Sequence, residues 1–139
     1  MPSMTSAPGK TPTARPFPIG RFDLAAEIDQ MRNSPRSAGH VGKTLLHDKD
    51  VRIVLMLLDR GAQIPTHRAK GALTFQGLEG RMIITLLGTS FDLAPGQLLA
   101  IERNVAHALV AVEDSALLLT IAPRTLTAST RDRGRSGDR

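Results

Sequence analysis

Short apolar runs separated by turn-forming residues fill residues 43–122 of this chain. The turns recur roughly every 8–12 residues, as is typical of sandwiches and barrels built from short strands. No interval is long enough for the crossover helices that parallel strands need, so the pattern predicts an all-β fold and excludes an α/β fold. The expected strands are residues 43–47, 51–58, 62–66, 72–78, 81–87, 90–93, 97–102, 106–112 and 115–122.

One short helix is expected before the strands. Asp23 is a suitable N-cap, and Leu24, Ile28 and Met31 follow at a helical spacing. The residue before a proline avoids the helical region, so the helix should end near Asn33-Ser34-Pro35.

The two ends of the chain differ from its centre in composition. Residues 1–18 are rich in Pro, Ser, Thr and Gly, and residues 124–139 contain almost no apolar residue, so both are predicted to be disordered tails. Together they hold seven of the 18 basic and two of the 13 acidic residues, which accounts for the whole net charge of +5. Residues 19–123 are therefore expected to form one neutral domain.

This distribution argues against a nucleic-acid-binding face on the domain. Aromatic residues make up 3% of the chain, with no Trp or Tyr, so platforms for stacking bases are scarce. Nucleic acid is an unlikely partner, except through weak phosphate contacts of the basic C-terminal tail.

Several other classes of protein are excluded or disfavoured. The chain has no Cys, so it can form neither disulfides nor thiolate metal sites. The apolar runs at 54–58 and 116–122 are far shorter than the roughly 20 residues that span a bilayer, and they fit buried strands instead. The N-terminus lacks the apolar core of a signal peptide, so a cytoplasmic protein is expected. No hydrolase elbow, P-loop or zinc-protease motif is present.

Two segments resemble the motifs of a known family. In Gly61–Gly80, a glycine, five residues and His67 are followed by a closing glycine, and Gly96–His107 keeps the spacing of a second motif. These segments resemble a small single-domain cupin, which implies a double-stranded β-helix, a jelly-roll-like barrel, with the short helix added at its N-terminus. Pairing of exposed sheet edges in such barrels suggests a homodimer.

The chain departs from the cupin motif at its metal ligands. The resemblance implies three His and one Glu around a divalent metal, but Ala69 stands where the second His is expected and Leu73 where the Glu is expected. Glu102 and Asn104 replace a proline and a glycine of the second motif. His67 and His107 remain, and two imidazoles alone hold a metal only weakly.

Three functions follow from this reading. The first is binding of a small organic ligand, without a tightly bound metal, in a pocket lined by His67, Leu73, Phe75, Met82, Ile84 and His107. The second is a dioxygenase- or isomerase-type enzyme in which His67, His107 and one further ligand hold Fe, Mn, Ni, Cu or Zn. The third is a non-catalytic scaffold or partner-binding barrel.

Four other polar residues are read as ordinary surface groups. His40 and His47 lie outside both motifs and are expected on loops or strand edges. Arg68 and Lys70 either draw an anionic ligand toward the pocket or are simply solvated charges.

Overall fold

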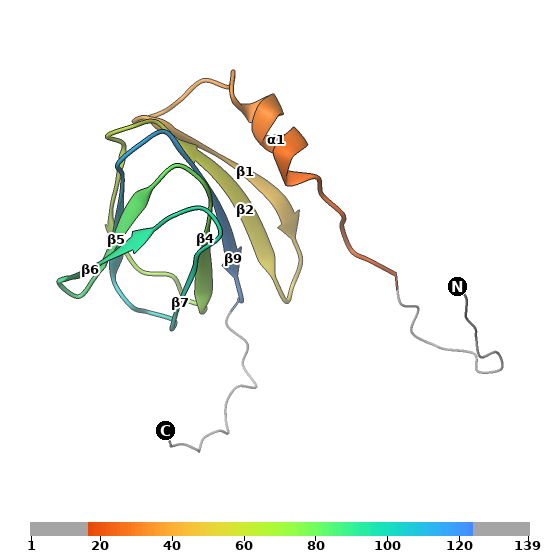
Figure 1. Ribbon diagram of the computed structural model, residues 1–139. Helices are drawn as coiled ribbons and strands as arrows, with labels where there is room; N and C mark the ends of the chain where they lie inside the picture. Colours follow the sequence, from red (N-terminus) through yellow and green to blue (C-terminus); the bar gives the residue numbers. More distant parts are fainter. Residues whose placement is uncertain (1–16, 124–139) are drawn as a thin grey trace, which may run out of the picture.

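The computed structural model describes residues 17–123 as a helix followed by two packed antiparallel sheets (Figure 1). The predicted tails lie, apart from residues 17 and 18, outside the described residues. The elements are α1 (Leu24–Met31), β1 (His40–His47), β2 (Arg52–Leu58), β3 (Gln63–His67), β4 (Leu73–Glu79), β5 (Met82–Leu86), β6 (Thr89–Leu93), β7 (Leu98–Ile101), β8 (His107–Ala111) and β9 (Ser115–Ile121).

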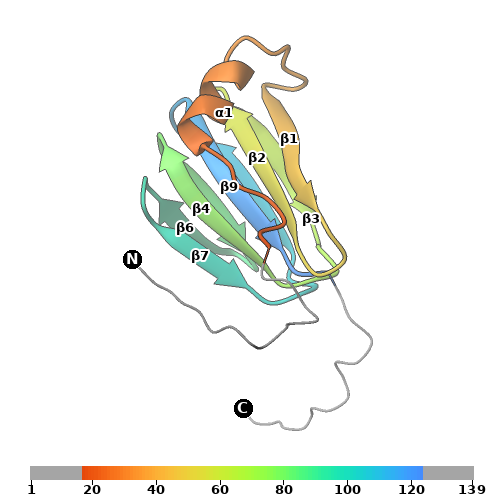
Figure 2. The ribbon, with the colours of Figure 1, turned by 90° about the vertical axis from the view of Figure 1, so that its right-hand side faces the viewer.

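The strands form a five-stranded sheet in the order β1-β2-β9-β4-β7 and a four-stranded sheet in the order β3-β8-β5-β6. All the pairings are antiparallel, and the two sheets face each other (Figures 1 and 2). The all-β prediction is confirmed, and every expected strand is present within a few residues. The main difference is that β1 begins at His40 and not at Lys43.

The helix begins as its sequence predicts. The Asp23 carboxylate accepts a hydrogen bond of 3.1 Å from the backbone N–H of Ala26, which satisfies one of the free donors at the helix start. Ile28 and Met31 are buried against the outer face of the five-stranded sheet, on Leu55, Leu57 and Ala116. The helix therefore covers the sheet face that points away from the barrel interior (Figure 2).

This arrangement explains the continuous apolar run of β2. Leu55 and Leu57 point outward to the helix, whereas Met56 and Leu58 point inward to the main core between the sheets. Since alternate residues of a strand face opposite sides, a strand that is covered on both faces needs apolar residues at every position. The same reasoning applies to β9.

Two glycines of the first motif occupy turns with positive φ. Gly61 follows β2 with φ +86°, and Gly80 follows β4 with φ +76°. A Cβ on Gly80 would overlap the backbone oxygen of Asp114 and the hydroxyl of Ser115, whereas a Cβ on Gly61 would meet nothing within 4 Å. The first glycine is thus required by its backbone conformation alone, and the second also by the close approach of another turn.

Within residues 17–123, no helix is long and apolar enough to cross a membrane.

Candidate ligand cavity

A cavity of about 270 Å³ lies between the inner faces of the two sheets. Nine of its twelve lining residues are apolar and the other three are histidines. They are His40, Met56, Ile64, His67, Ala69, Leu73, Phe75, His107, Leu109, Leu117, Leu119 and Ile121. A cavity with such walls favours an apolar occupant, and the imidazoles are the only polar side chains that the described residues contribute to it.

His67 and His107 face each other across two neighbouring strands. They are partners in the register of β3 and β8, and their ring centroids are 4.2 Å apart at an interplanar angle of 64°. The ring of Phe75 lies edge-on to His107, with the centroids 5.4 Å apart. His107 is buried, at 4% exposure, while His67 is exposed. The two rings in contact therefore extend from the buried interior of the barrel to its surface.

Backbone carbonyls orient both rings. Nδ1 of His107 lies 3.0 Å from the carbonyl oxygen of Val105, and Nδ1 of His67 lies 3.4 Å from that of Pro65. A carbonyl can only accept, so Nδ1 donates, and in the neutral ring Nε2 keeps its lone pair. Burial lowers the pKa of His107, assisted by the nearby His67, while the bond to Val105 opposes the shift. His107 is accordingly a neutral imidazole at neutral pH, available as an acceptor.

A protein-family model described as a cupin domain matches residues 54–122, which run from β2 to the end of β9. The chain belongs to the cupin family. No curated protein matches the chain.

Solved structures give the same fold. A conserved protein of unknown function from Streptococcus pyogenes is 27% identical, with a TM-score of 0.60 over 66% of this chain and 80% of that one. KdgF from a Halomonas species is 26% identical, with a TM-score of 0.60 over 66% and 86% of the two chains. A cupin superfamily protein from Desulfitobacterium hafniense is 20% identical, with a TM-score of 0.63 over 81% and 94%.

Three altered positions of the cupin motifs can be located in the structure. Ala69 and Leu73 both line the cavity, so the residues that replace the missing ligands make its wall apolar. Asn104 has a φ of +63°, a conformation that asparagine tolerates better than most non-glycine residues, which explains why it can replace a glycine. The Asn104 backbone N–H also donates to the carbonyl of Ala69, at 2.8 Å, and so ties two loops together.

Of the predicted pocket residues, the structure brings His67, Leu73, Phe75 and His107 together around the cavity. Met82 and Ile84 require a correction, because both are completely buried in the adjoining core and do not line the cavity. Their zero exposure means that neighbouring side chains already fill the space against them.

His40 was missed as a pocket residue, although it lines the cavity. It stands opposite Leu58 in the register of β1 and β2, and Leu58 points into the main core. The sequence places His40 ahead of the predicted strand, in a loop. Extending that strand back to residue 40 would have provided the signal, since alternation then turns His40 inward.

The described side chains form no ready-made cluster of metal ligands. Among residues 17–123, no group of three or more His, Asp or Glu side chains is placed to hold a metal. Three histidines line the cavity, but they do not converge as such a group, and the bonds of the Nδ1 atoms of His67 and His107 to carbonyls leave each Nε2 unbonded to the described part of the protein.

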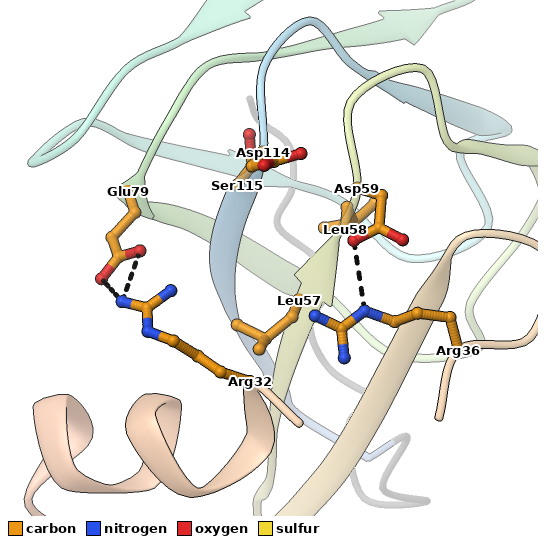
Figure 3. A pocket seen from close by; sticks show the side chains of 8 residues that line it. All are labelled: Arg32, Arg36, Leu57, Leu58, Asp59, Glu79, Asp114 and Ser115. Atoms are coloured by element: carbon orange, nitrogen blue, oxygen red, sulfur yellow. Dashed lines mark hydrogen bonds and ion pairs between the residues drawn. The ribbon is translucent and has the colours of Figure 1, made fainter. Parts of the chain in front are cut away.

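A second, polar pocket of about 180 Å³ lies at the end of the barrel where the helix ends (Figure 3). Four of its charged side chains form two pairs: Arg32 donates to both oxygens of Glu79, at 2.9 and 3.1 Å, and Arg36 to Asp59, at 3.2 Å. The fifth, Asp114, accepts from the backbone N–H of Arg60, at 2.7 Å. The hydrogen bonds and attraction of Glu79 raise the pKa of Arg32 above its ordinary value. We refer to this site as the charged-pair pocket; a ligand there would have to displace existing partners.

Proposed function

We propose that this cupin binds a small organic ligand in the cavity between its sheets, without a tightly bound metal. The observation that carries the proposal is the apolar cavity to which residues 17–123 contribute imidazoles as the only polar side chains, two of them in contact. Binding sites for small molecules combine apolar walls with a few polar groups that fix orientation. A cavity of about 150 Å³ accommodates benzene, so one of about 270 Å³ has room for about ten non-hydrogen atoms.

A thermal-shift screen of aromatic and aliphatic compounds tests this proposal. A ligand at about 100 times its Kd should stabilise the folded protein by about 2.7 kcal/mol. Ala69→Leu, which places a larger side chain in the cavity wall, should abolish the stabilisation. The matched control is Ala100→Leu, which adds the same side chain at an exposed position of β7 and should leave binding unchanged. Stabilisers that act equally on Ala69→Leu would refute binding in the cavity.

The alternative is a divalent-metal-dependent enzyme of the dioxygenase or isomerase type. It is supported by the contact of the two motif histidines and by the fold shared with salicylate 1,2-dioxygenase from Pseudoaminobacter salicylatoxidans. That enzyme is 20% identical to this chain, which covers 29% of it. Elemental analysis of the purified protein decides between the two proposals. Stoichiometric Fe, Mn, Ni, Cu or Zn that is lost in His67→Ala would favour the enzyme.

An added ligand sharpens this comparison. Ala69 lines the cavity beside His67, so Ala69→His would supply the third imidazole of the cupin motif. We expect this variant to retain more metal than the wild type, because three imidazoles hold a divalent ion better than two. Equal metal content in both proteins would mean that the geometry of the pair is unsuitable for a metal.

The third function, a scaffold or partner-binding barrel, is the outcome if no compound stabilises the protein. The homodimer expected from the sequence is a separate proposal. It is supported by the edge strands of the two sheets, β1, β7, β3 and β6, which each lack a partner on one side within the described chain. Light scattering after size-exclusion chromatography tests it, and a monomer mass at all concentrations would contradict it.

A further inference from the structure

A wider cavity adjoins the cavity between the two sheets, which we now call the inner cavity. The wider cavity lies at the end of the barrel opposite the charged-pair pocket. We refer to it as the mouth. Its volume is about 540 Å³, and its wall consists of His47, Arg52, His67, Ala69, Lys70, Gly71, Ile121 and Pro123. Three of these residues, His67, Ala69 and Ile121, also line the inner cavity. One molecule could therefore occupy both spaces.

The register of the five-stranded sheet directs two basic side chains into the mouth. His47 pairs with Arg52 across β1 and β2, and Arg52 pairs with Ile121 across β2 and β9. Residues directly opposite each other have their side chains on the same face of a sheet, and neighbouring strands are about 4.8 Å apart. Since Ile121 lines the inner cavity, Arg52 and His47 face the interior side as well.

An irregularity in β1 gives His47 this orientation. The pairing of β1 with β2 shifts between Thr44 and Leu46, so one additional residue is accommodated on β1. Such a bulge reverses the alternation of the residues that follow it. Without it, His47 would share the outer face with Val41 and Leu45, which pack near the helix.

The basic side chains of the mouth have no acidic partner within residues 17–123. Among the residues that the structure describes, no Asp or Glu lines the mouth. Within residues 17–123, Arg52 and Lys70 form no ion pair and no side-chain hydrogen bond, unlike the arginines of the charged-pair pocket. Arg68 does have a partner, because it donates to the carbonyl of Asn104 at 2.8 Å, so it is not free to bind a ligand in the same way as Lys70.

We propose that the ligand is a small amphipathic anion. Its apolar body lies in the inner cavity, and its carboxylate lies at the mouth, where Arg52 and Lys70 bind it. This inference rests on the proposed function and adds the chemical class of the ligand. Charge-assisted hydrogen bonds from arginine to a carboxylate are stronger than neutral ones, and the carboxylate remains partly hydrated at an open site. The apolar walls reject a second charged group on the body of the molecule.

Matched acids and alcohols test the assignment on the full chain by calorimetry. The pairs are octanoate with 1-octanol, benzoate with benzyl alcohol, and 2-naphthoate with 2-naphthalenemethanol. Within at least one pair the acid should bind about tenfold more tightly than the alcohol, a difference of about 1.4 kcal/mol. Added salt should weaken the binding of the acid but not that of the alcohol, because salt screens exposed charges.

Variants locate the anion. The double variant Arg52→Gln, Lys70→Gln should weaken the binding of the acid about tenfold and leave the binding of the alcohol unchanged. Arg60→Gln is the matched control, since Arg60 is an exposed arginine beyond the other end of β2, and it should have no effect.

The outcomes separate the two proposals. If acid and alcohol bind equally and the double variant changes neither, the anion site is refuted while the cavity remains a ligand site. If no compound of any pair binds, both proposals are overturned, because these bodies span the size that the inner cavity admits. A loss of acid binding that is equally large in Arg60→Gln would show general attraction by the basic chain and would also refute the anion site.

Discussion

Both ends of the barrel carry basic side chains, but within the described residues those at one end are paired with carboxylates and those at the other are not. At the end of the barrel where the helix ends, both arginines of the charged-pair pocket are bound to carboxylates (Figure 3). At the mouth, Arg52 and Lys70 line an open space to which the described part of the chain contributes no carboxylate. The difference shows that a pocket with many charged residues is not by that fact a binding site. Charges that already have partners stabilise the fold, whereas charges without partners can bind a ligand.

The largest expected effect is on stability, and it concerns the turns at the end of the barrel that holds the charged-pair pocket. Gly80→Ala combines a positive φ with overlap against the backbone of Asp114, so the two turns would have to separate. We expect a loss of about 2–4 kcal/mol in the free energy of unfolding, since overpacking and strain add. Gly61→Ala has the same strain but open space around it, and should lose only about 1 kcal/mol.

Urea denaturation of the two variants measures this difference. The Gly80 variant should also disturb the hydrogen bonds of Ser115. Its hydroxyl accepts from the backbone N–H of Arg81, and its single proton lies within hydrogen-bonding distance of the carbonyls of Glu113, at 2.7 Å, and Arg81, at 3.1 Å. Equal losses in both variants would mean that the close approach of the turns contributes nothing, and that the conformation of the glycines is the whole requirement.

A smaller effect distinguishes arginines at the two ends. The Arg36 side chain is largely covered and binds Asp59 as well as the carbonyls of Met31 and Ser34 at the helix end. Arg36→Met should therefore cost about 1–2 kcal/mol, because the Ser34 carbonyl and the Asp59 carboxylate lose their donor. Arg52→Met should change stability by no more than about 0.5 kcal/mol, as expected for an exposed residue without partners.

Thermal and urea unfolding of both variants, without ligand, provide the measurement. The binding assays should give the reverse order, with Arg52 important and Arg36 neutral. If Arg52→Met destabilised the protein as much as Arg36→Met, the mouth would have a structural role that its lack of partners does not indicate.

The sequence predicts the strands well because turn residues and apolar runs are local signals. It also predicts that His67 and His107 meet, since the resemblance to a cupin fixes the frame that the two share. It does not predict which buried residues border empty space: Leu73 does and Met82 does not, although both are apolar residues on inward-facing positions. That distinction depends on how completely neighbouring side chains fill the core.

The mouth could not be predicted for another reason. Arg52 and Lys70 lie far apart in the sequence, and only the register of β2 with β9 brings Arg52 to the cavity face. His47 additionally depends on the bulge in β1, which no local residue pattern announces. Long-range pairing is thus the information that the sequence alone does not supply.

The smallest effect is a dependence of stability on pH that originates in the inner cavity. Burial lowers the pKa of His107 in the folded protein below its ordinary value near 6.5. Below pH about 6.5 the unfolded chain therefore takes up a proton that the folded protein does not, which favours unfolding. The contribution of His107 to stability is complete above pH about 6.5, declines as the pH falls, and is lost once the pH reaches the folded pKa.

His107→Leu should reduce this decline, as measured by urea denaturation between pH 7.5 and the lowest pH at which the protein stays folded. Phe75→Leu is the control, because it alters packing against the same ring without removing a titrating group. It should keep the wild-type slope at a lower overall stability. If the free energy of unfolding of His107→Leu depended on pH as steeply as that of the wild type, His107 would not be the source of the decline. Water would then reach the ring through the mouth, and the inner cavity would be less separated from solvent than its apolar wall implies.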